Sequence, residues 1–220
     1  AFIQCYTTCQ PEHGVGDHLS TKHAQLARDS RGLPEFVFDP TKGEDATRCL
    51  SLKGNPHVDR DWTTIELKPS GERYDYTVAH WAATEARFRA HFRPATEDDV
   101  ARLPRLEDLL LRITQDDVVH RRHLDPSHRA FVPPEGAWTR AVDKRGELAP
   151  VVVTRVLSLW CVERRKAWRL LQARAGIRNR DAAAQTNLLK AADEGRVTRD
   201  VLMTRTREMF EIERKALAAT

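Results

Sequence analysis

The first forty residues alternate between two patterns, and this alternation limits the folds open to the chain more than any other feature. Residues 2–6 form a short apolar run rich in β-favouring side chains. Residues 18–31 then carry apolar side chains at helical spacing, and Gly32 stands where a helix would end. A second short strand is predicted over residues 35–38. The order strand, helix, strand predicts a parallel βαβ unit and places the chain in the α/β class.

The rest of the chain predicts a mostly helical extension with one β-hairpin. Residues 41–76 hold scattered Pro and Gly, which predict an irregular connection with room for one hairpin. The segments near 138–142 and 148–153 flank a turn sequence and predict a hairpin. Apolar periodicity predicts helices over residues 77–92, 103–113, 116–123, 156–171, 181–194 and 199–218. We therefore divide the chain into residues 1–40, 41–76 and 77–220.

Charge and composition limit the classes of partner. The chain has a formal net charge of +4, and residues 140–220 carry 18 Lys and Arg against 10 Asp and Glu. Because acids are interspersed with these bases, we favour a solvated helix surface over the alternative of nucleic-acid binding through this basic region. No apolar run is long enough to cross a bilayer, and four cysteines do not make a disulfide framework. We expect a cytoplasmic protein with free thiols and no membrane partner.

The loop at residues 9–17 is the candidate site, because ligands often bind at the carboxyl ends of strands in open α/β sheets. One alternative is a metal site, since soft and borderline ligands gather in this region, but their spacing does not match the close pairs of structural zinc sites. We favour a buried thiol at Cys5 and a loop thiol at Cys9. The possible ligands are Cys5, Cys9, His13, His18 and His23.

A second alternative is a nucleophilic Cys9 with His13 as its base, for which Glu12 or Asp17 would orient the imidazole. The segment at residues 14–17, Gly-Val-Gly-Asp, matches half of a phosphate-binding loop. It lacks the third glycine and the Lys-Ser or Lys-Thr ending, so we do not interpret it as one.

Further along, the predicted helix over residues 77–92 carries Glu85 on its apolar side. We expect Glu85 to pair with Arg89 one turn away, with a ligand-facing carboxylate as the alternative. Core and interface packing is the expected role of three tryptophans, Trp138, Trp160 and Trp168.

The motifs of residues 1–40 resemble the end of the thiamine diphosphate-binding domain in the pyruvate:ferredoxin (flavodoxin) oxidoreductase family. There, a last core strand ends in Ser-Pro-Cys, followed by His-Gly, a covering helix and an aromatic residue before Asp-Pro. Cys9 matches the cysteine, His13 and Gly14 match His-Gly, and residues 38–40 (Phe-Asp-Pro) match the final element. Thr8 stands where the family has proline. Residues 76–92 are similar to C-terminal extensions of large fused oxidoreductases of this group.

The resemblance implies a terminal segment of an enzyme that oxidatively decarboxylates a pyruvate-type 2-oxoacid. Such an enzyme transfers the acyl group to coenzyme A and passes electrons through iron–sulfur clusters to ferredoxin or flavodoxin. The resemblance also implies that Cys9, His13 and Gly14 are cofactor-loop residues. The sequence has neither a Gly-Asp-Gly magnesium motif nor a Cys-x-x-Cys. We therefore expect no catalytic residue and no cofactor bound by this segment alone; the parent would hold thiamine diphosphate, magnesium and the clusters.

Two readings of the biological context follow. In the first, the N-terminus is a cut edge of a sheet, and the partners are the remainder of the parent polypeptide or other oxidoreductase subunits. In the second, the chain is a non-catalytic interaction module whose basic helical tail docks on another protein.

Overall fold

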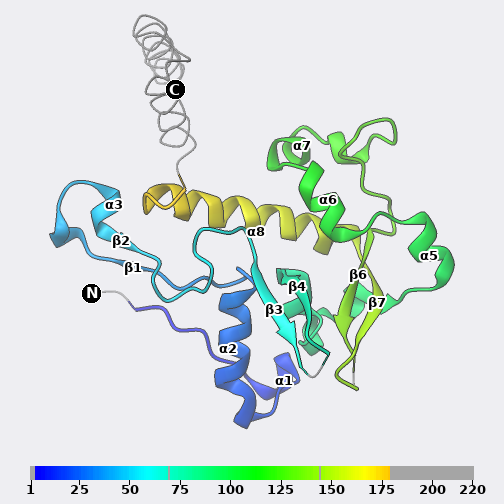
Figure 1. Cartoon of the computed structure of the whole chain (residues 1–220), viewed down its shortest axis with the longest axis horizontal. Helices are drawn as coiled ribbons and strands as arrows, with labels where there is room; N and C mark the ends of the chain where they lie inside the picture. The colour runs from blue at the N-terminus through cyan, green and yellow to red at the C-terminus, as the bar shows by residue number, and fades with distance from the viewer. Residues whose placement is uncertain (1–2, 69, 144, 179–220) are drawn as a thin grey trace, which may run out of the picture. The chain divides into compact units, whose positions relative to one another are not determined.

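The computed structural model describes residues 3–68, 70–143 and 145–178. Two units divide the chain, Ala1–Ala175 and Gly176–Thr220. The helices predicted over residues 181–194 and 199–218 lie outside the described residues. The first unit combines short helices with small antiparallel sheets, so a general α/β class holds (Figure 1). In the described part of the chain, no helix has the length and apolar character needed to cross a membrane.

The N-terminal segment contains helices but not the strand expected at residues 2–6, of which the described residues 3–6 carry no strand assignment. The helices are α1 (Gln10–His13), a 3-10 turn η1 (Asp17–Leu19) and α2 (Ser20–Asp29). Helix α2 occupies most of the predicted range of residues 18–31. The left-handed residue after it is Arg31, with φ +62°, and not Gly32.

The second predicted strand forms as β1 (Val37–Phe38), but it pairs antiparallel with β2 (Leu50–Ser51). Between them the chain reverses through a 3-10 turn η2 (Pro40–Lys42) and α3 (Ala46–Cys49). This reversal supplies β1 with a local, antiparallel partner. The parallel βαβ unit is therefore not shown within the described residues.

Residues 41–76, predicted as an irregular connection with room for one hairpin, contain that hairpin as well as the short elements α3 and β2. Their second half is a hairpin of β3 (Thr63–Leu67) and β4 (Glu72–Tyr76), in register from Thr63 opposite Tyr76 to Leu67 opposite Glu72. Tyr76 at the end of β4 is buried and leads directly into the central helix.

The hairpin predicted near residues 138–153 is confirmed as β6 (Ala137–Val142) and β7 (Leu148–Val153). A short strand β5 (Phe92–Pro94) adds to the other edge of β7, giving the order β5-β7-β6. Gly136 precedes β6 with φ +107°, and a Cβ there would lie 1.9 Å from the Val153 carbonyl oxygen. Only glycine permits this close approach.

The extension is helical, as predicted, with one important break. The long helix is confirmed as α8 (Arg155–Arg174). The helix expected over residues 77–92 forms instead as α4 (Val78–Ala82) followed by a 3-10 segment η3 (Ala86–His91), so one continuous helix was wrong. The remaining helices are α5 (Glu97–Arg102), α6 (Leu106–Arg112), α7 (Gln115–Val119) and a 3-10 turn η4 (Arg122–Leu124).

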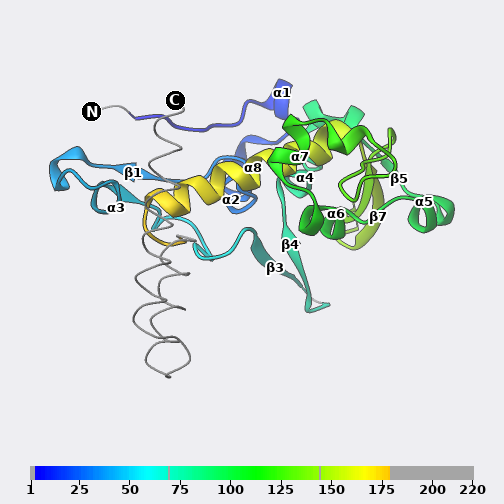
Figure 2. The same cartoon turned by 90° about the horizontal axis from the view of Figure 1, so that it is seen from above.

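Helix α4 lies at the centre of the core and packs against α8, α2 and β4 (Figure 1, Figure 2). Val78, Ala79 and Ala82 are completely buried, and their small size lets neighbouring elements approach closely. Trp168 on α8 is also completely buried, and Trp160 packs against the core, as core packing predicts. Indole Nε1 of Trp168 donates to the carbonyl oxygen of Arg60 at 2.8 Å.

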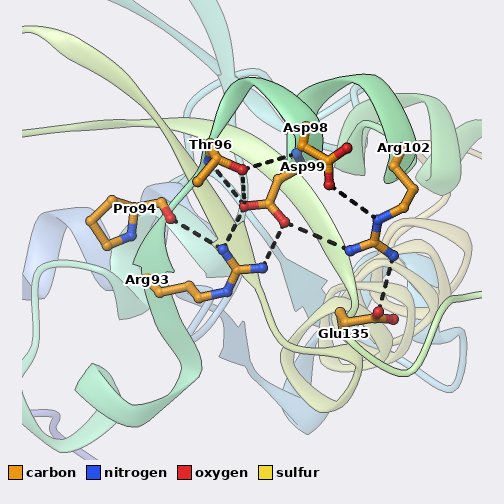
Figure 3. Close-up of polar contacts among 7 residues, drawn as sticks. All are labelled: Arg93, Pro94, Thr96, Asp98, Asp99, Arg102 and Glu135. Atoms are coloured by element: carbon orange, nitrogen blue, oxygen red, sulfur yellow. Dashed lines mark hydrogen bonds and ion pairs between the residues drawn. The ribbon is translucent and has the colours of Figure 1, made fainter.

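A polar network fixes the start of α5 (Figure 3). Thr96 caps the helix by accepting from the Asp99 backbone N–H, and Asp99 in turn accepts from the Thr96 backbone N–H at 2.9 Å. This reciprocal arrangement is a capping box. Both terminal nitrogens of Arg93 on β5 donate hydrogen bonds to the Asp99 carboxylate, at 2.5 and 2.7 Å. The network therefore ties the edge strand of the sheet to the first turn of α5.

Candidate functional site

The three loop residues singled out from the sequence, Cys9, His13 and Gly14, are brought together by a single helical turn, α1. Cys9 is the residue before the turn and has an extended backbone, while Gly14 ends the turn with φ +66°. The Gly14 backbone N–H donates to the Gln10 carbonyl oxygen at 2.9 Å. The Gly14 N–H is thus bonded within the turn itself.

His13 is buried and bonds to the backbone of Cys9. Its Nδ1 lies 3.0 Å from both the backbone N–H and the carbonyl oxygen of Cys9, so it accepts from the former or donates to the latter according to the tautomer of the ring. The structure shows no hydrogen bond between the His13 ring and the Cys9 thiol, although both residues are described. A general base must reach the proton that it removes. The geometry therefore does not support Cys9 as a nucleophile activated by His13; the Cys9 thiol is exposed instead.

Gly14 packs against the 3-10 segment η3. A Cβ built on Gly14 would lie 2.7 Å from the Cβ of Ala86, closer than side chains tolerate. Glycine is thus required at this position both for the left-handed backbone and for contact between α1 and η3.

Sequence reasoning missed the side chains that hold this loop in place. The Tyr6 hydroxyl donates a hydrogen bond of 2.7 Å to Glu85, and Arg87 Nε donates to the same carboxylate at 2.6 Å. The Tyr6 ring also makes edge contacts with His13 and with Trp81 on α4, at 5.9 and 6.2 Å between ring centroids. Burial and the bond to Glu85 raise the pKa of Tyr6 far above its ordinary value.

Glu85 is buried, but the predicted pair with Arg89 was wrong. The prediction assumed a continuous helix, in which residues four apart share a face. Instead Glu85 has an extended backbone, φ −114° and ψ 133°, between α4 and η3. This conformation brings Arg87, two residues on, to the carboxylate. The two hydrogen bonds satisfy a charge that would otherwise be costly to bury.

His23 on α2 is a further buried group near this carboxylate. Burial lowers the pKa of His23, the His13 ring lowers it further, and Glu85 acts in the opposite direction. The His23 Nδ1 is buried and has no hydrogen-bond partner among the residues that the structure describes. We call Tyr6, His13, His23, Glu85 and Arg87 the Glu85 cluster.

The metal alternative finds no support in this geometry. Within residues 3–68, 70–143 and 145–178, no group of three or more His, Cys, Asp and Glu side chains could hold a metal ion. Cys5 is exposed, contrary to the buried thiol we expected, and so is Cys9. The Glu85 cluster contains one carboxylate, which already accepts hydrogen bonds from Tyr6 and Arg87. The cluster therefore attaches the N-terminal segment to the core.

Another buried histidine, His80, also escaped the sequence analysis. Its Nδ1 accepts from the Thr77 backbone N–H at 3.0 Å, so the proton sits on Nε2, which donates to the Arg140 carbonyl oxygen at 3.2 Å. The ring stacks on Tyr76 at 5.6 Å. Burial lowers the pKa of His80 to about 4. Its neutral ring therefore connects α4 to the hairpin strand β6.

Comparison of the chain with protein-family models, with curated proteins and with solved structures finds no match.

Proposed function

We propose that this chain is the terminal segment of a thiamine diphosphate-dependent 2-oxoacid:ferredoxin or flavodoxin oxidoreductase of the pyruvate type. Its role in that enzyme is structural: it packs on the remainder of the polypeptide or on another subunit and is not catalytic alone. The motif order around Cys9, His13 and Gly14 supports the family. The parent is a cytoplasmic oxidoreductase with iron–sulfur clusters and coenzyme A as acyl acceptor.

One structural observation carries the packing role: an apolar run around β1 is exposed. Phe36, Val37 and Phe38 are 55, 58 and 59% exposed, and Ile3 is 82% exposed. Because successive side chains of a strand point to opposite faces, exposure of both Val37 and Phe38 leaves both faces of β1 uncovered. Exposed apolar surface of this kind marks an interaction site.

In the proposed parent, this exposed run is covered by sheet and helix elements of the remaining polypeptide. The segment at residues 3–6, which carries no strand assignment here, becomes the last strand of the parallel βαβ unit in that larger sheet. An edge strand readily accepts such a neighbour through its free backbone groups.

The three loop residues that match the family motif do not fit a magnesium diphosphate site by themselves. His13 Nδ1 is bonded to the Cys9 backbone and the Gly14 N–H to Gln10, and Cys9 offers a thiol. Magnesium requires oxygen ligands. The thiamine diphosphate therefore belongs to the rest of the parent, with this loop at most at the edge of its pocket, and we assign no step to these residues.

The test is isolation of the native protein through an affinity tag fused to the 3′ end of its gene at the chromosomal locus. We expect a polypeptide much larger than 25 kDa, or a stable complex, that contains thiamine diphosphate by thiochrome fluorescence and iron by elemental analysis. A native product of about 25 kDa with neither cofactor nor cofactor-bearing partner would contradict the proposal. A 25 kDa product bound to a partner without cofactors would favour the docking module instead.

The exposed run can be tested separately with the 220-residue chain. We expect the chain to enhance the fluorescence of a hydrophobic dye, and Phe36→Ser with Phe38→Ser to reduce that enhancement by more than half. Leu111→Ser is the matched control, because Leu111 is 87% exposed on α6, away from β1. Equal reductions by the two changes would show that the run near β1 has no special role.

A further inference from the structure

A cavity of about 300 Å³ lies between α7 and the middle of α8. Its volume is at the small end of the range for ligand pockets in proteins. Helix α7 lies far from β1, whereas α8 runs across the fold from the region of β2 and α3 toward α6 and α7 (Figure 1). It is lined by Thr114, Gln115, Asp116, Val119, Val162, Arg165, Lys166 and Arg169.

The guanidinium of Arg165 is the first notable group that lines this cavity, because it is a buried charge. Arg165 is only 6% exposed, and its two terminal nitrogens donate to the carbonyl oxygens of Leu110 and Ile113. No ion pair of Arg165 with an acid occurs in the described parts of the chain. Burial is the main cause of the lowered pKa of Arg165. Within the described residues, two carbonyl groups thus accept from this cation and no carboxylate forms an ion pair with it.

The next residue, Lys166, adds a second uncompensated charge. Its ammonium makes neither a hydrogen bond nor an ion pair with any described residue, and the side chain is exposed at the cavity. The other charges of the lining are already matched. Arg169 donates two hydrogen bonds to Asp61, and Asp116 is engaged by Arg122 and His120.

A third unsatisfied group completes the polar side of the cavity. The side-chain oxygen of Gln115 is buried and has no hydrogen-bond partner in the part of the chain that the structure describes. The oxygen and nitrogen of a glutamine amide exchange places by a half-turn, so the same side chain can present N–H donors to a ligand. Val119 and Val162 supply apolar surface beside these polar groups.

We propose that this cavity binds a small phosphorylated organic molecule. The phosphate dianion lies between Arg165 and Lys166, whose two charges balance it, and accepts a further hydrogen bond from the Gln115 amide. The organic part packs on Val119 and Val162. Two unmatched cations favour a dianionic phosphate over a single carboxylate, because charge-assisted hydrogen bonds from both can be made to its oxygens.

The test uses the 220-residue chain and phenyl phosphate as the probe, with inorganic phosphate, benzoate and sodium chloride at matched ionic strength as further arms. We expect phenyl phosphate to raise the melting temperature in a saturable way, as a ligand of the native state does, and to do so more strongly than inorganic phosphate. Benzoate and sodium chloride should give much smaller shifts. A shift of equal size with sodium chloride would overturn the proposal.

Substitutions then test whether phenyl phosphate binds in this cavity. Lys166→Gln removes one charge-assisted contact and should weaken binding of phenyl phosphate at least about tenfold. Lys53→Gln is the matched control, because Lys53 is also an exposed lysine but does not line the cavity. Val119→Phe fills the cavity from a position that is 64% exposed, so it should block binding while leaving the fold intact. Unchanged affinity in Lys166→Gln and Val119→Phe, or equal loss in Lys53→Gln, would overturn the assignment.

Discussion

The hydroxyl of Tyr6 donates a hydrogen bond of 2.7 Å to the carboxylate of Glu85, which lies 79 positions later in the chain. This contact joins a segment without strand structure to the junction between α4 and η3. Because Glu85 is buried, the phenol and Arg87 together provide the polar environment that its charge requires. The bond is therefore a specific attachment of the N-terminal segment to the core.

Removing this bond should destabilise the chain. Tyr6→Phe leaves one oxygen of a buried carboxylate without its donor, at a cost of about 1 to 3 kcal/mol in the free energy of unfolding. Urea unfolding measures the change. Tyr76→Phe is the control, because the buried Tyr76 hydroxyl has no hydrogen-bond partner among the described residues. Its removal should be neutral or stabilising; an equal loss in both variants would argue against the role of Glu85.

Gly14→Ala should lower the free energy of unfolding more than the same change at another glycine with a similar backbone conformation. Gly14 and Gly71 have φ of +66° and +72°, but a Cβ at Gly71 meets nothing within 4 Å. We expect Gly71→Ala to lower the free energy of unfolding by about 1 kcal/mol, from backbone strain alone. Gly14→Ala adds the clash with Ala86, so adding Ala86→Gly to it should restore part of the lost stability. Equal costs at the two glycines would show that contact between α1 and η3 is loose.

His80 should stay neutral well into the acidic range. Its pKa in the folded state, about 4, lies below the ordinary value of 6.5, so the unfolded chain takes up a proton first. This contribution to stability is complete above pH 6.5 and is lost as the pH falls toward 4, by up to about 1.4 kcal/mol per pH unit. The His80 ring resonance, assigned by its loss in His80→Gln, should titrate near pH 4. A midpoint near 6.5 would contradict the buried neutral ring.

The network at the start of α5 predicts different outcomes for two adjacent acids (Figure 3). The Asp99 side chain is 6% exposed and accepts from Arg93 and Thr96, whereas that of Asp98 is 84% exposed and lies 3.8 Å from Arg102. Asp99→Asn should lower the urea midpoint clearly, and Asp98→Asn should leave it nearly unchanged. The Arg93 guanidinium and the Thr96 N–H hold the pKa of Asp99 far below its usual range. The stabilisation by Asp99 is therefore present above pH 4 and lost at lower pH.

The four thiols should fall into two classes in the folded chain. Cys5 and Cys9 are exposed, whereas Cys49 and Cys161 are buried, and burial raises the pKa of Cys161 to about 12. A chromogenic disulfide reagent should therefore modify two thiols quickly and the other two only after unfolding, since the thiolate is the reactive form. Cys9→Ser should remove one fast equivalent. Fast modification of all four thiols would contradict the packing of α8.

Local signals were sufficient where an element depends mainly on its own residues. The turn between residues 142 and 148 predicted the β6–β7 hairpin, and the apolar spacing along α8 predicted a helix that the structure confirms. The approximate positions of α2, α6 and α7 also follow from their periodicity. For such elements the determining interactions are a few residues apart, so one sequence contains them.

Tertiary structure decided the elements whose partners are distant. Glu85 interrupts the helix predicted over residues 77–92, and its phenol donor, Tyr6, cannot be inferred from any spacing between the two residues. The direction of β1 depended likewise on the chain reversal that brings β2 beside it. Of the candidate site, the sequence by itself indicated only that Cys9, His13 and Gly14 lie in one loop, and the helical turn α1 that brings them together is seen only in the structure. That His13 is buried, that Cys9 is exposed and that Gly14 touches Ala86 was settled only by packing, because burial depends on which segments meet in space.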